Sequence, residues 1–240
     1  MAWSLRPSTA YYDHYLQSVQ ALETEQTGLK QFIEATDLSS SNARESILEK
    51  IGKARMKLKL VDFWLRYLDP VEYNKINGQL PVEWETEVFE KFEKPYRRDG
   101  AGLSLAAKLF DEDQVNKDSL LSLVNRSITA THSFFADSNT RHLTEPGHFF
   151  FANRLFLLNL AAVYTTGFEC PDKHAIVPEL KLMLNGVQDI YRDYLNSFPS
   201  LPLSAGYQDL FGKCIRFTDN RTVHAKSLRA CNPKVHPQHA

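Results

Sequence analysis

The stretch ESILEKIGKARMKLKLVDFWLRYLDP, residues 45–70, decides the fold class of this chain. Its apolar residues recur three or four positions apart, at Ile47, Ile51, Ala54, Leu58, Val61, Leu65 and Leu68. This spacing places them on one face of an α-helix, because the helix makes a turn every 3.6 residues. Asn42 and Glu45 predict a capping box at the start of this helix. Pro70 predicts its end, since the residue before a proline avoids the α region.

The same periodicity runs through most of the chain, and sustained β alternation is absent. Further helices are predicted over Tyr11–Ile33, Val82–Phe92, Leu120–Phe135, Thr144–Gly167, Ile176–Leu195 and Ser204–Phe217. The prediction is therefore an all-α fold built as an antiparallel helical bundle. We expect two packed bundle halves, about residues 8–110 and 116–218. The tail at residues 219–240 has little apolar periodicity and is expected to be disordered.

The composition bounds the possible partners. The chain has 240 residues and a net charge of −1, and no basic stripe is present, so nucleic acid is not an expected partner. The most apolar stretch, Phe149–Val163, is too short to cross a bilayer and contains Arg154. It predicts a buried core helix and no transmembrane segment. The N-terminal residues lack the apolar region of a signal peptide, so we expect either a cytoplasmic chain or a given sequence that lacks its leader.

The cysteines argue against a resident cofactor. Cys170, Cys214 and Cys231 form no C-x-x-C pair, which zinc clusters and iron–sulfur centres usually require. Covalent haem needs C-x-x-C-H, and the tail offers only Cys231 with His236 five positions later. A G-x-S-x-G element, a P-loop and a G-x-G-x-x-G motif are also missing. The sequence therefore predicts no catalytic and no cofactor-binding residues, and no cofactor in this chain.

One polar cluster is a candidate metal site, formed by His142, Glu145 and His148. Glu145 and His148 are three positions apart, as in the Glu-x-x-His pairs of di-iron bundles, but no second such pair follows. The favoured interpretation is a helix start in which Thr144 is the N-cap and Glu145 complements the helix dipole. Under that interpretation a bound metal ion is an alternative rather than the expectation.

A basic run lies between Lys50 and Lys59, and Lys50, Lys53 and Lys57 share a helical face. The favoured interpretation is a solvated face of the helix. The alternative is docking to an acidic partner, such as a redox protein or an anionic lipid.

Several segments, taken in order, carry a resemblance to a known family. They are ARMKLK at 54–59, NKING at 74–78, TEPGHFFFAN at 144–153, TGFECPD at 166–172 and NSFP at 196–199. This pattern resembles the imelysin-like helical region that precedes the haem domains in a family of bacterial di-haem cytochrome c peroxidases. The resemblance extends over about residues 11–217. It implies an all-α fold of two related bundles, a periplasmic or cell-envelope location, and a link to iron or haem-redox chemistry.

The chain departs from that family at its metal element. Imelysin-type proteins carry G-x-H-x-x-E, and the matching segment here places Leu103 and Ala106 where the histidine and glutamate would stand. Neither side chain can ligate a metal, so metal binding and peptidase activity are not carried over. The leading hypothesis is a non-enzymatic accessory or interaction domain whose partner is another protein or the haem domain of the same system. The alternatives are an N-terminal fragment of a di-haem cytochrome c peroxidase, and a divergent metal-binding protein of imelysin type.

Overall fold

The computed structural model describes residues 9–218, apart from residues 39, 85–95, 113, 202, 205, 207 and 208. Five long helices build the described part: α1 (Ala10–Ala35), α2 (Ser41–Leu68), α5 (Lys117–Ser133), α7 (Pro146–Asn159) and α8 (Ile176–Ser197). Shorter helical segments connect them: α3 (Pro70–Ile76), α4 (Gly102–Lys108), η1 (Leu109–Asp111), α6 (Asp137–Thr140), η2 (Arg141–Thr144) and η3 (Leu160–Tyr164). Residues 209–218 are also helical. The all-α prediction is confirmed.

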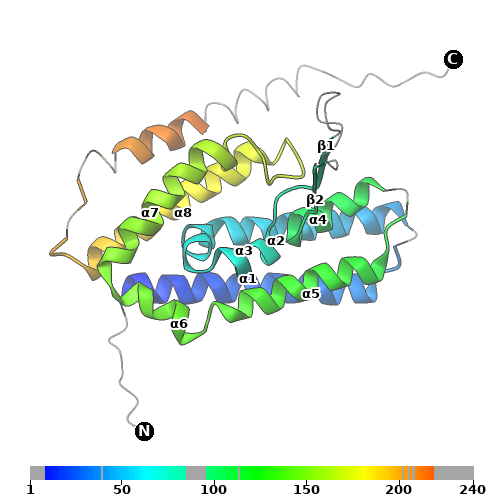
Figure 1. Cartoon of the computed structure of the whole chain (residues 1–240), viewed down its shortest axis with the longest axis horizontal. Coiled ribbons are helices and arrows are strands. Elements are labelled where there is room, and N and C mark those ends of the chain that lie inside the picture. Colours follow the sequence, from blue (N-terminus) through cyan, green and yellow to red (C-terminus); the bar gives the residue numbers. More distant parts are fainter. Residues whose placement is uncertain are drawn as a thin grey trace, which may run out of the picture.

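The helices pack in antiparallel fashion around one apolar core (Figure 1). Helix α1 contacts α2, α5 and α8, and α2 contacts α7 and α8. Trp64 of α2 is 1% exposed, and its ring meets those of Tyr11 and Tyr15 of α1 at 5.7 and 5.6 Å. The two expected halves of the chain, residues 8–110 and 116–218, therefore contribute to the same core within the described residues.

Helix α2 follows the predicted pattern. The apolar stripe from Ile47 to Leu65 is buried, and Leu68 is half-buried against the core. The helix ends before Pro70, as predicted. Asp69 then caps α3, because its side chain accepts hydrogen bonds from the backbone N–H groups of Val71 and Glu72.

The predicted capping box of α2 is wrong. Ser40 is the N-cap, with φ −87° and ψ 133°, and the helix already includes Asn42. The Asn42 carbonyl accepts a hydrogen bond from the Ser46 hydroxyl one turn later. An N-cap residue has an extended backbone, so Asn42 cannot serve as one here.

The helix predicted over Val82–Phe92 is wrong where the structure describes it. Strand β1 (Val82–Trp84) pairs antiparallel with β2 (Tyr96–Arg98), with Val82 opposite Arg98. Val, Trp and Tyr favour strands, and a cross-strand ladder satisfies their backbone groups without a helix. Residues 85–92 lie outside the described residues, as does the predicted tail at 219–240.

The start of α7 also differs from the prediction. Thr144 lies in the 3₁₀ turn η2, where its hydroxyl donates to the Arg141 carbonyl, so it does not cap α7. Glu145 occupies the N-cap position and Pro146 the first helical position. The helix continues into the π turn η3 rather than running unbroken to Gly167. Gly167 has the left-handed conformation expected of it, with φ +72°.

None of the described helices is both long and apolar enough to cross a membrane.

Candidate functional site

A network of charged side chains lies inside the bundle, at the junction of α2, α3, α4 and α8. Among the described residues it contains three cations and three carboxylates. They are Arg55, Lys59, Asp62 and Arg66 of α2, Glu169 of the turn after η3, and Glu179 of α8. Arg66 is half-buried and the other five are buried. Each charge buried at this depth needs a partner of opposite sign and hydrogen bonds, because the removal of a charge from water is costly.

Arg55 links α2 to three other segments. Its Nε and Nη2 donate to the two carboxylate oxygens of Glu179, each at 2.8 Å. Its Nη1 donates to Asn77 Oδ1 and Ser104 Oγ, both at 2.7 Å. This bidentate geometry is the strongest form of a guanidinium–carboxylate pair. One side chain thus joins α2, the end of α3, α4 and α8.

Asp62 is the most enclosed member of the network, with 0% exposure. It accepts hydrogen bonds from four side chains, at 3.1–3.3 Å: Lys59, Arg66, Tyr73 and Tyr164. Burial by itself would raise the pKa of Asp62. The nearby charges of Arg66 and Lys59, together with the donated hydrogen bonds, outweigh burial and hold that pKa below its usual value. Asp62 is therefore a carboxylate at neutral pH.

Glu169 joins the hydrogen bonds around Asp62 to those around Arg55. Its two carboxylate oxygens accept hydrogen bonds from Arg66, at 2.7 and 3.1 Å. One of the same oxygens accepts a hydrogen bond from Asn77 Nδ2 at 3.2 Å. The Asn77 amide also accepts a hydrogen bond from Arg55. This one side chain therefore connects Glu169 to Arg55.

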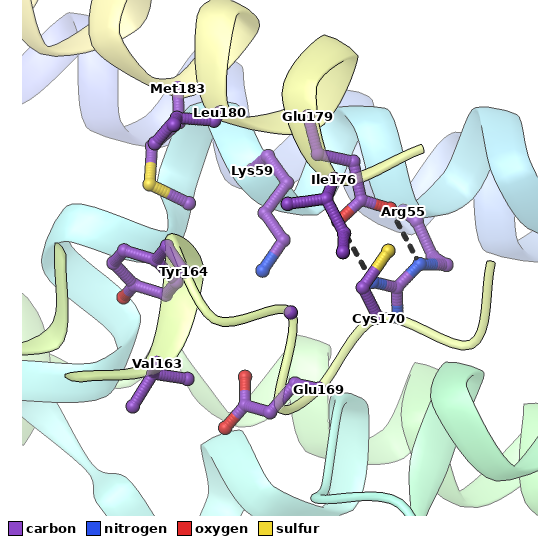
Figure 2. A pocket seen from close by; sticks show the side chains of 11 residues that line it. Arg55, Lys59, Val163, Tyr164, Glu169, Cys170, Ile176, Glu179, Leu180 and Met183 are labelled. Carbon is purple, nitrogen blue, oxygen red and sulfur yellow. Dashed lines mark hydrogen bonds and ion pairs between the residues drawn. The ribbon is translucent and has the colours of Figure 1, made fainter. Parts of the chain in front are cut away.

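A small cavity opens beside Lys59 (Figure 2). Its volume is about 20 Å³, which holds about one water molecule. The Lys59 ammonium points into it and lies 5.0 Å from the centre of the Tyr164 ring. Cys170 lines the same cavity, and burial, followed by the charge of Glu179, raises the pKa of its thiol. A raised pKa favours the thiol form, which is a weaker nucleophile than the thiolate.

The network corrects the interpretation of the basic run Lys50–Lys59. Lys53 is exposed and pairs with Glu49 at 2.8 Å, as a solvated face requires. Arg55 and Lys59, however, are only 3% and 4% exposed, because their carboxylate partners meet them inside the fold. Arg55, Lys59, Asp62 and Arg66 follow a four–three–four spacing beside the apolar stripe. That mixture of both charge signs on one helical face was the available signal for buried pairs, and sequence reasoning missed it.

Three of the segments that carry the family resemblance meet in this network. Segment 54–59 supplies Arg55 and Lys59, segment 74–78 supplies Asn77, and segment 166–172 supplies Glu169. The segment 101–106 of the chain supplies Ser104, whose hydroxyl contacts Asn77 at 2.7 Å. Residues of these three segments thus help to fix α2, α3, α4 and α8 against one another.

Leu103 and Ala106 are both 0% exposed and belong to the apolar core.

The structure brings His142, Glu145 and His148 together. His142 Nδ1 lies 3.2 Å from His148 Nε2, and Glu145 lies 3.4 Å from the same His148 nitrogen. The Tyr67 hydroxyl lies 2.5 Å from His148 Nδ1. Burial, and then the neighbouring His148, lowers the pKa of His142. In the described part of the chain no group of three such ligands has the arrangement to hold a metal ion, so the metal hypothesis stays a prediction.

The outer face of α7 is apolar and exposed. Phe150, Phe151 and Leu158 are 44%, 60% and 61% exposed, while Phe149 and Phe156 on the opposite face are buried. Stretch 149–163 is therefore not the fully buried core helix that its composition predicts. A helix that is apolar all round is expected inside a protein, so this face lacks a covering element among the described residues.

Comparison of the chain with protein-family models, with curated proteins and with solved structures found no match.

Proposed function

We propose that this chain is a helical interaction domain without an active site of its own. In this proposal it binds the haem domain of an envelope redox system through the outer face of α7. The class of partner comes from the family resemblance. The binding face comes from the exposure of Phe151 and Leu158, which is the observation that carries the proposal.

The charges around this face support a partner other than a second copy. Arg154 is exposed between Phe151 and Leu158 and has no ion-pair partner among the described residues. It lies near the middle of α7 (Pro146–Asn159), so two antiparallel copies crossing at their centres would oppose two arginines. Like charges in direct opposition are unfavourable. A partner surface that is apolar around one carboxylate would satisfy both the phenyl rings and the guanidinium.

The buried charge network supports the absence of an active site. Each carboxylate of the network accepts hydrogen bonds from at least two donor groups, and the adjoining cavity holds about one water molecule. A general base needs a free carboxylate within reach of a substrate. The network instead serves to fix α2 against α3, α4 and α8.

The test is a sedimentation-velocity titration of a purified di-haem cytochrome c peroxidase domain from the same genome, followed at its haem absorbance. Adding this chain should shift the haem-bearing species to a larger sedimentation coefficient. Phe151→Glu and Leu158→Glu should each weaken binding about tenfold or more, because a charge would enter an apolar contact.

Val71→Glu is the matched control, since Val71 is 68% exposed on α3, away from this face, and should bind like the unmodified chain. If Phe151→Glu and Leu158→Glu both bind as tightly as the unmodified chain, the outer face of α7 is not the docking face. Concentration-dependent self-association of the chain alone, abolished by Leu158→Glu, would mean that α7 contacts a second copy instead.

A further inference from the structure

A second and larger cavity lies on the other side of the Arg55–Glu179 pair. Its volume is about 340 Å³, within the range of pockets that bind small organic molecules. Helix α2 forms one wall, α4 and η1 form the opposite wall, and residues 171–175 close the end toward α8. The side chains of Leu48, Ile51, Phe110 and Pro171 give it an apolar lining.

Gly52 keeps this cavity open. It lies in the interior of α2, where a glycine costs about 1 kcal/mol of helix stability relative to alanine. A Cβ atom built at Gly52 would meet no atom within 4 Å, so packing does not require the glycine. A larger side chain at this position would instead extend into the space that the cavity now occupies.

Among the residues that line the cavity, the carboxylates outnumber the cations by three to two. Arg55 pairs with Glu179, and Lys108 pairs with Asp111. Asp172 is the third carboxylate of the lining, and no cation among the described residues pairs with it. Within the part of the chain that the structure describes, its Oδ1 accepts the backbone N–H of His174, at 2.8 Å, and its second oxygen accepts no hydrogen bond, so that oxygen is available at the rim.

We propose that this cavity binds a small organic amine with a single ring or a branched apolar body. The ammonium group pairs with Asp172, and the apolar body lies against Ile51 and Phe110. This site is separate from the face of α7 and does not depend on the proposed docking function.

Phenethylamine is a suitable probe, with phenethyl alcohol and phenylacetate as neutral and anionic molecules of similar shape. Binding to the full chain is measured by calorimetry and by ¹H–¹⁵N chemical shifts. Phenethylamine should bind most tightly and phenylacetate least. Asp172→Asn should weaken phenethylamine about threefold, the size of one partly exposed ion pair, and leave the alcohol unchanged.

Gly52→Leu should fill the cavity and weaken phenethylamine and phenethyl alcohol about tenfold or more. Gly28→Leu is the matched control, because Gly28 is also inside a long helix with open space around a Cβ, but lines no part of this cavity. If Gly52→Leu does not fold, the test is the set of chemical-shift changes that phenethylamine causes in the unmodified chain. These changes should centre on Gly52, Ala107 and Ala175.

Three results would overturn the proposal. The first is phenylacetate binding as tightly as phenethylamine, and the second is full binding by a folded Gly52→Leu. The third is the absence of any chemical-shift change around the cavity at millimolar phenethylamine.

Discussion

Asp62 is the carboxylate that two cations of the network, Lys59 and Arg66, share. Lys59 and Arg66 both contact its carboxylate, and of these two cations Lys59 is buried while Arg66 is half-buried. A buried ion pair adds little stability over an apolar pair of the same shape, but the loss of one partner leaves the other charge uncompensated. The contribution of Asp62 to stability is therefore best measured by removing that one charge.

We predict that Asp62→Asn lowers the free energy of unfolding by about 3–5 kcal/mol, because buried Lys59 loses its carboxylate and half-buried Arg66 loses one of its two. Urea unfolding followed by circular dichroism measures this change. Glu49→Gln is the control on the same helix, since Glu49 pairs with Lys53 at the surface and should change stability little. A loss below about 1 kcal/mol in Asp62→Asn would show that the network is not structurally important.

The placement of α3 against α4 depends on a close contact between their backbones. The end of α3 and the start of α4 meet through the bridge between Asn77 and Gly102. Gly102 has φ +59°, and a Cβ atom there would lie 2.2 Å from the Ile76 carbonyl oxygen. This close approach places Asn77 and Ser104 within reach of Arg55. The backbone contact between α3 and α4 thus positions the charge network.

Gly102→Ala should destabilise the chain by about 2–3 kcal/mol, from the left-handed backbone and the clash with Ile76 together. Thermal unfolding gives the change in midpoint. In Gly147→Ala, by contrast, the new methyl group meets nothing within 4 Å near the start of α7, and stability should hold or rise slightly. Equal midpoints for the two variants would contradict the role of the Asn77–Gly102 contact.

At the scale of the whole molecule, one core joins helices from both ends of the described chain. Phe149 of α7 stacks on Tyr194 of α8 with ring centres 3.8 Å apart, and Tyr11 of α1 meets both rings. The charge network sits beside this core and ties α2 to α8. Loss of the network should therefore loosen the bundle as a unit rather than one helix.

The stability of the bundle should fall in acid. The pKa of Asp62 lies below its unfolded value of about 3.9, so the folded form binds its proton less readily than the unfolded form. The stability that Asp62 contributes is fully present when the pH is above the unfolded-state pKa. It is lost as the pH falls toward the lower pKa of the folded state. Urea midpoints should drop between pH 5 and about pH 3.

The Asp62→Asn variant is the control for this pH dependence, since it lacks the titrating group and should lose less stability over the same interval. If both proteins respond identically to acid, other carboxylates govern the acid response.

The sequence by itself determined the all-α class and the buried stripe of α2. Both follow from local spacing, since residues three and four apart must share a helical face wherever that helix lies. It also predicted the end of α2 before Pro70 and the left-handed Gly167, which depend on backbone sterics of one or two residues.

Only the tertiary structure decided which charges are buried and which apolar residues are exposed. Arg55 and Glu179 are 124 residues apart, and Arg66 and Glu169 are 103 apart, so no local pattern pairs them. The same holds for Val82, whose strand exists because Arg98 lies opposite it. For α7, composition predicted burial on all sides, but a helix can bury only the faces that neighbouring elements reach. The exposed Phe151 and Leu158 follow from that packing.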